Sequence, residues 1–101
     1  MKIEINDDTI QISDVQELTA GKSSEVKEAI KRAFAPDLKN IEFLCEVLEF
    51  VDSSGLGALI SLQKLAKERN GSFKLIAPLP SVIQLLEYTS LHRVFTIVAS
   101  R

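Results

Sequence analysis

The stretch Asp52-Ser53-Ser54-Gly55-Leu56-Gly57 stands between a short apolar segment, typical of a buried strand, and a long amphipathic segment, typical of a helix. Asp52 is a favourable N-cap residue, because its carboxylate can accept a hydrogen bond from the free backbone N–H of Ser54 or Gly55 and its charge suits the positive end of a helix. Glycine costs helix stability, so Gly55 and Gly57 indicate that another backbone or a partner approaches closely. We therefore expect a strand-to-helix corner that presents Ser53 at the first helical position.

The segments on both sides of this corner support the prediction. The helix is expected from about Ser54 to Arg69, and Asn70-Gly71 ends it, with Gly71 suited to the left-handed conformation of a helix C-terminus. Its apolar side consists of Leu56, Leu59, Ile60, Leu62, Leu65 and Ala66, and its wet side of Gln63, Lys64, Lys67 and Glu68. Before the corner, packing is expected from Leu48, Phe50 and Val51, whereas Glu46 and Glu49 face water.

The N-terminal half of the chain predicts a hairpin, a helix and a strand. Lys2–Ile5 and Thr9–Ile12 alternate polar and apolar residues around the turn at Asn6–Asp8, which favours a hairpin with one buried face. A helix begins near Thr19–Ser24 and ends before Pro36. Its apolar face consists of Val26, Ala29, Ile30, Ala33 and Phe34. Ile41–Cys45 is then apolar enough for a central strand.

The C-terminal segments complete an α/β pattern. Ser72–Ile76 and Val94–Val98 read as strands, and Pro78–Ser81 introduces a helix that carries Val82, Ile83, Leu85 and Leu86. Strands that alternate with helices imply right-handed crossovers. We expect one α/β domain over residues 1–101, with a mixed β-sheet of four to five strands and packed α-helices. In such a sheet, binding sites collect at the carboxyl ends of strands, where Ser53 lies.

Composition excludes several classes of function. The 101 residues carry a net charge of −2 with both signs interspersed, so no basic stripe points to nucleic acid or to an anionic membrane. No apolar run reaches the roughly 18–20 residues that cross a bilayer, so membrane insertion is not expected. The single cysteine cannot form an internal disulfide, and the N-terminus shows no secretory leader, which predicts a cytoplasmic protein.

The sequence offers little for catalysis. A serine nucleophile needs a general base, and the only histidine is His92, so a hydrolase built on Ser53 and His92 is the one enzymatic alternative. Cys45 has no second cysteine or nearby histidine, and we expect it to pack as a small buried residue. Gly55-Leu56-Gly57 is too short for a nucleotide-binding loop, and no spacing suits zinc. We therefore expect no enzyme, no cofactor and no metal.

The segment from Phe50 to Gly57, followed by the apolar run Ala58-Leu59-Ile60-Ser61-Leu62, resembles the signature of STAS domains, specifically of the bacterial anti-sigma factor antagonists. The resemblance implies a STAS-like fold and phosphorylation of the serine directly after the aspartate, which is Ser53 here. Local physics alone leaves Ser53 and Ser54 open, because either hydroxyl is free only if another group caps the helix. Gln16-Glu17-Leu18-Thr19 departs from the family pattern, in which an aspartate takes the place of Thr19.

The same resemblance implies a binding protein controlled by phosphorylation. The implied partners are an anti-sigma factor, or a related serine kinase with a histidine-kinase-like ATPase fold, and a PP2C-type serine phosphatase. The expected partner-binding residues are those of the corner itself: Asp52, Ser53, Ser54, Gly55, Leu56 and Gly57. The alternative is a STAS subunit that is never phosphorylated, as in a bacterial lipid-transport ABC complex. A stressosome-type scaffold component is a third reading.

Overall fold

A computed structural model of the protein describes residues 1–99, so the last two residues of the predicted domain, 100 and 101, lie outside the described residues. The elements in chain order are β1 (Lys2–Asn6), β2 (Thr9–Ser13), β3 (Glu17–Leu18), α1 (Ala20–Ala33), β4 (Asn40–Leu44), β5 (Phe50–Val51), α2 (Ser53–Glu68), β6 (Phe73–Ile76), α3 (Pro80–Tyr88), the 3-10 helix η1 (Leu91–Arg93) and β7 (Thr96–Val98).

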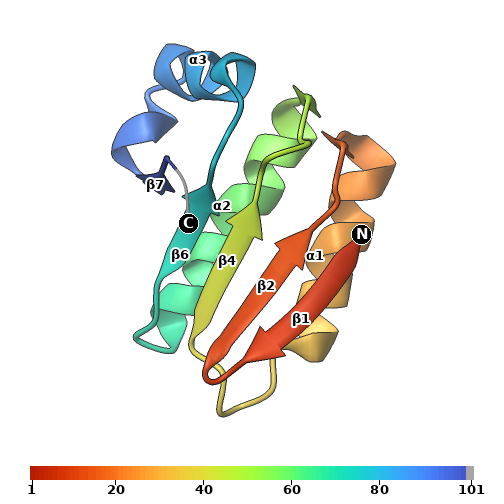
Figure 1. Ribbon diagram of the computed structural model, residues 1–101, viewed down its shortest axis with the longest axis vertical. Helices are drawn as coiled ribbons and strands as arrows, with labels where there is room; N and C mark the ends of the chain where they lie inside the picture. Colours follow the sequence, from red (N-terminus) through yellow and green to blue (C-terminus); the bar gives the residue numbers. More distant parts are fainter. Residues whose placement is uncertain (100–101) are drawn as a thin grey trace.

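Five strands form one mixed sheet in the order β1-β2-β4-β6-β7, which confirms the predicted fold class. β1 and β2 are the antiparallel hairpin, and every other neighbouring pair in this sheet is parallel. Helices α1 and α2 lie side by side on one face of the sheet, and α3 lies beyond the carboxyl end of β6 (Figure 1). The apolar–polar alternation of the strands explains this layering, because only one sheet face needs a cover.

The core fills the space between the sheet and the two long helices. The sheet contributes Ile10, Ile12, Ile41, Phe43 and Leu75, and the helices contribute Val26, Ile30, Leu59, Leu62 and Ala66, all of them buried. The opposite sheet face is polar, and there Gln11 donates a hydrogen bond of 2.7 Å to Glu42 from the neighbouring strand. No helix formed by residues 1–99 is both long enough and apolar enough to span a membrane.

The prediction for the two sides of α2 was wrong at two positions. Gln63, predicted to face water, is buried, and its Nε2 donates to the backbone oxygen of Val94 over 3.1 Å. Ile60, predicted to face the core, is 38% exposed. Gln63 is covered because the segment after α3 returns along α2, over a flank that the helical period alone assigns to solvent.

The end of α2 also differs from the prediction. Asn70, with φ of 59°, takes the left-handed conformation, and Gly71 does not. Gly71 is needed for space, because a Cβ built on it would lie 1.8 Å from the backbone oxygen of Lys39. Arg69 joins the end of α2 to the segment that follows α1. Its guanidinium donates to the carbonyls of Phe34 and Leu38 and lies 4.0 Å from the centroid of the Phe34 ring.

The last strand is shorter than predicted. β7 begins at Thr96, because η1 and the α-helical backbone of Val94 occupy the preceding residues. Phe95 is nevertheless buried and meets Phe73 edge to face, with ring centroids 5.8 Å apart. This contact fastens the C-terminal segment to β6.

Candidate functional site

The predicted corner is formed by a short pair of parallel strands outside the main sheet. β3 pairs with β5, with Glu17 opposite Phe50 and Leu18 opposite Val51. The backbone N–H of Asp52 extends this pairing by donating to the carbonyl oxygen of Leu18 over 3.2 Å. The sequence did not predict this two-stranded sheet, since two residues are too few to show a period. The pairing of β3 with β5 determines where β5 ends and α2 begins.

Asp52 caps α2 as predicted. Its backbone is extended, with φ of −100° and ψ of −172°, and its Oδ1 accepts a hydrogen bond of 2.9 Å from the N–H of Gly55. The Asp52 carbonyl accepts the first helical bond, from the N–H of Leu56, over 3.0 Å. Ser53 is therefore the first residue of α2, and it is exposed to solvent. Because the aspartate is the cap, the Ser53 hydroxyl is not required for that role.

The two glycines of the corner have different surroundings. A Cβ on Gly55 would lie 2.2 Å from the carbonyl oxygen of Leu18 and 2.8 Å from Cγ1 of Val51. The close approach predicted at Gly55 is thus made by the chain's own backbone. A Cβ on Gly57 would meet no atom within 4 Å, so nothing in residues 1–99 explains that glycine. Gly57 faces outward and leaves the surface of the first helical turns open.

The six predicted site residues therefore divide into two groups. Gly55 and Leu56 turn inward, where Gly55 is buried and Leu56 packs against the core. The exposed group consists of Asp52, Ser53, Ser54 and Gly57. The structure brings this second group together as one surface at the N-terminal end of α2.

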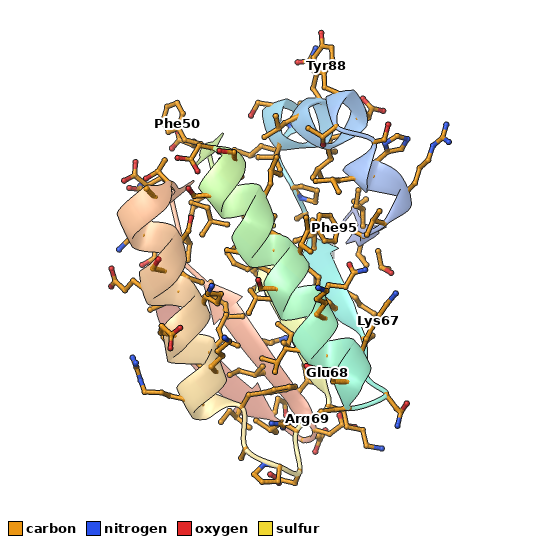
Figure 2. The ribbon with its side chains drawn as sticks, turned by 180° about the vertical axis from the view of Figure 1, so that it is seen from behind. Phe50, Lys67, Glu68, Arg69, Tyr88 and Phe95 are labelled. Carbon is orange, nitrogen blue, oxygen red and sulfur yellow. The ribbon has the colours of Figure 1, made fainter. Side chains whose placement is uncertain are left out.

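Phe50 adds an apolar group to that surface and corrects its predicted role in packing. Its side chain is 64% exposed, and it projects from the end of the molecule where α2 begins (Figure 2). Residues of a two-residue strand outside the main sheet have no second layer to cover both faces, which explains the exposure. A large exposed aromatic residue three positions before Ser53 is the kind of group that anchors protein interfaces.

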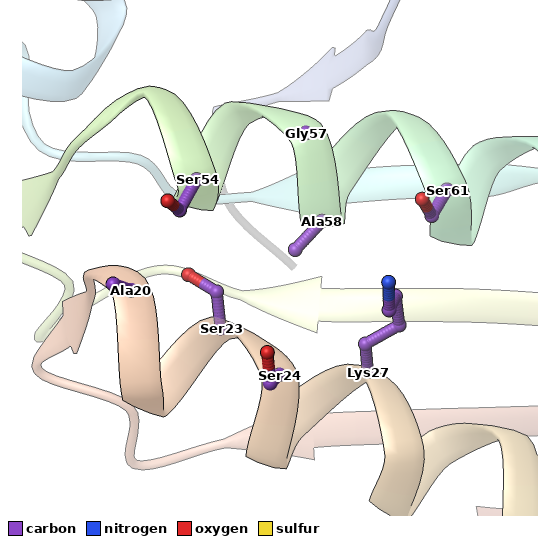
Figure 3. A pocket seen from close by; sticks show the side chains of 8 residues that line it. All are labelled: Ala20, Ser23, Ser24, Lys27, Ser54, Gly57, Ala58 and Ser61. Carbon is purple, nitrogen blue, oxygen red and sulfur yellow. The ribbon is translucent and has the colours of Figure 1, made fainter.

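A groove runs between α1 and α2 next to the corner. Its volume is about 330 Å³, and it is lined by Ala20, Ser23, Ser24, Lys27, Ser54, Gly57, Ala58 and Ser61. Ser54 and Gly57 therefore belong to the groove as well as to the corner, whereas Ser53 does not line it (Figure 3). Sequence reasoning missed the α1 side of the groove, because the period of α1 says nothing about which polar residues will face α2.

Two candidate reactive groups lie apart from this surface. His92 belongs to η1, which packs against α3 and β7, whereas Ser53 opens α2 beside β3 and β5. Cys45 is fully buried, its thiol lies 3.4 Å from the carbonyl oxygen of Phe43, and burial raises its pKa to about 12. This confirms Cys45 as a packed thiol. Within residues 1–99, no group of three histidine, cysteine or acidic residues is arranged to hold a metal ion.

Comparisons with known proteins agree with this architecture. The family model described as STAS domain matches residues 1–101. TM1081 of Thermotoga maritima, a protein assigned as an anti-sigma factor antagonist, superposes with a TM-score of 0.83 at 22% identity, over 96% of this chain and 84% of that one. The anti-sigma factor antagonist SpoIIAA in its unphosphorylated form gives 0.80 at 22% identity, over 96% of this chain and 86% of that one.

SpoIIAA in its phosphorylated form, described as a Bacillus cell fate determinant, is also similar, with a TM-score of 0.74 at 22% identity over 96% of this chain and 89% of that one. At such identities the likeness shows a shared fold.

Proposed function

Because the chain belongs to the STAS domain family, we propose that it is an anti-sigma factor antagonist whose binding is switched by phosphorylation of Ser53. In its unphosphorylated form it binds an anti-sigma factor, or a related serine kinase with a histidine-kinase-like ATPase fold, in the cytoplasm. That binding releases the regulator's own target. Phosphorylation by the same kinase ends binding, and a PP2C-type phosphatase restores it.

The observation that carries the proposal is the position of Ser53. It is exposed at the first residue of α2, and Asp52 caps the helix in its place. A kinase can therefore reach the hydroxyl without breaking a cap. Phosphorylation adds about −1.5 to −2 charges, and the N-terminus of a helix tolerates negative charge well. The modification should consequently change the surface and leave the fold intact.

The surroundings of Ser53 support a protein partner. Phe50 offers an exposed aromatic anchor, and Gly57 leaves the helix surface open for close contact. A phosphate at the edge of such an interface must lose water when a partner docks, and it repels acidic groups on the partner. A cost of about 1.4 kcal/mol already lowers affinity tenfold. SpoIIAA, which shares this fold, has been characterised in both an unphosphorylated and a phosphorylated form.

The test compares two variants of Ser53 in binding to the cognate serine kinase, which is first sought among the products of neighbouring genes. Ser53→Ala should bind the kinase constitutively, and Ser53→Asp should bind it at least tenfold more weakly. Ser81, an exposed serine in the first turn of α3, provides matched controls, and Ser81→Ala and Ser81→Asp should both bind like wild type. Equal capture of the kinase by both Ser53 variants would overturn the proposal.

The competing function makes the chain a permanent subunit of a lipid-transport ABC complex. Native purification distinguishes the two. A stable complex with an ATPase and a permease, together with no phosphoserine by mass spectrometry, would contradict the proposed phosphorylation switch.

A further inference from the structure

We propose that the groove between α1 and α2 is a binding site for a phosphate-sized oxyanion, free or carried as a small phosphomonoester. The groove shares Ser54 and Gly57 with the corner, but Ser53 does not line it, so this site is distinct from the proposed phosphorylation site. Its lining combines four serines and one lysine with two alanines and a glycine. The small residues open the space, and the polar ones supply hydrogen-bond donors.

The buried hydroxyl of Ser23 is the first observation behind this inference. The residue is 3% exposed, and its Oγ has no hydrogen-bond partner among residues 1–99. A buried hydroxyl without a partner costs about 1–3 kcal/mol, and a ligand that accepts a hydrogen bond from it would offset that cost. Figure 3 shows the side chains of Ser23 and Ser54 pointing toward one another across the groove from α1 and α2. The hydroxyl is thus aimed into the space that a ligand would occupy.

The charge of the groove favours an anion. Lys27 reaches from α1 toward α2, and no aspartate or glutamate lines the groove (Figure 3). The ion pairs found among residues 1–99 join Lys2 with Glu4 and Lys22 with Glu25, which leaves the Lys27 ammonium without a carboxylate partner in that range. A lysine ammonium offers only donors, and each serine hydroxyl beside it can turn its O–H toward a ligand that already carries negative charge.

Helix geometry adds to this preference. Ala20, the first residue of α1, and Ser54, the second residue of α2, both line the groove. The positive ends of both helices therefore lie at the same end of the groove, and such ends favour anions. Thr19, the N-cap residue of α1, gives its helix no side-chain hydrogen bond. The volume of about 330 Å³ stands at the lower end of the range for small-molecule sites, which suits a phosphate or a small phosphomonoester.

The test is a titration of the purified chain followed by backbone amide NMR at constant ionic strength. One arm uses inorganic phosphate, the second uses glycerol phosphate and the third uses chloride. Phosphate or glycerol phosphate should give saturable shifts at Ser23, Ser24, Lys27, Ser54 and Ser61, and chloride should not. Tighter binding in the glycerol phosphate arm would identify a monoester as the source, and equal or weaker binding would identify free phosphate. No saturable shift in either phosphate arm would overturn the proposal.

Variants then assign the binding to the groove. Ser23→Ala and Lys27→Met should each weaken binding at least tenfold. Lys31→Met, one turn further along α1 and outside the groove, is the matched control and should bind like wild type. Ser23→Ala should leave the unfolding midpoint unchanged or raise it, since it removes a buried hydroxyl without a partner, so a loss of affinity cannot be ascribed to unfolding. Undiminished binding by both groove variants would show that the anion binds elsewhere.

Discussion

Gly55 lies directly against the backbone of Leu18, so that a Cβ built on the glycine would come within 2.2 Å of the Leu18 carbonyl oxygen. That oxygen also accepts the N–H of Asp52. It therefore cannot move away without breaking the junction between β3 and the corner. The contact joins the segment before α1 to the first turn of α2, and it makes this glycine a requirement of the fold.

The two glycines of the corner should respond in opposite ways to alanine. Gly55→Ala is expected to lower the free energy of unfolding by about 1–3 kcal/mol, because a backbone atom obstructs the added carbon. Gly57→Ala should raise it by up to about 1 kcal/mol, because the added carbon meets nothing and alanine favours the helix. Urea denaturation of the pair checks this, and equal effects of the two substitutions would contradict it.

Removing the N-cap should destabilise the first turn of α2 and leave the main sheet intact. Asp52→Ala loses the 2.9 Å hydrogen bond to the N–H of Gly55 and is expected to lower the free energy of unfolding by about 1 kcal/mol. Asp52→Asn keeps a side-chain acceptor and should retain most of that stability. Hydrogen exchange at the amide of Gly55 gives the local measurement, and unchanged protection in Asp52→Ala would show that another group caps the helix.

Modification of Ser53 should leave the domain folded. Because the added charge lies at the positive end of α2, the free energy of unfolding is expected to change by less than about 1 kcal/mol in Ser53→Asp. Thermal unfolding compares this variant with wild type, and Ser53→Ala serves as the uncharged control. Fragmentation mass spectrometry after incubation with kinase and ATP locates the phosphate. Phosphate on Ser54, or undiminished labelling of Ser53→Ala, would contradict the assignment.

Burial of Cys45 should make stability fall at high pH. The pKa of the thiol is raised from 9.0 to about 12 in the folded chain, so the folded state keeps a proton that the unfolded state loses above its own pKa. This contribution is fully present below pH 9.0 and is lost as the pH rises toward about 12. Between these limits the slope approaches about 1.4 kcal/mol per pH unit.

Urea denaturation from pH 8 to pH 11 measures this dependence as a difference between wild type and Cys45→Ala. The variant lacks the titrating thiol and cancels the contribution of the other groups. A difference that stays constant across the series would show that the thiol ionises equally in both states.

Much of this protein was predictable from its residues alone. A period of about two residues located the hairpin, and apolar positions at helical spacing located the helices, since apolar spacing reports which face of an element is buried. Short apolar runs located the parallel strands of the main sheet. The capping role of Asp52 was predictable, because the N–H group that it binds lies only three residues away along the chain. The signature from Phe50 to Gly57 predicted the family that the family model shows, and the structure places Ser53 at the first residue of α2, as expected.

Only the tertiary structure decided which surfaces the elements share. Gln63 is buried because the segment after α3 covers it, and Phe50 is exposed because no other segment within residues 1–99 covers it. The local apolar period does not predict such contacts between distant segments. Position 55 requires glycine because the carbonyl oxygen of Leu18, a residue distant in sequence, lies where a Cβ would stand. The groove that joins Ser23 to Ser54 likewise exists only where α1 and α2 pack together, because its two walls come from parts of the chain that local interactions never bring into contact.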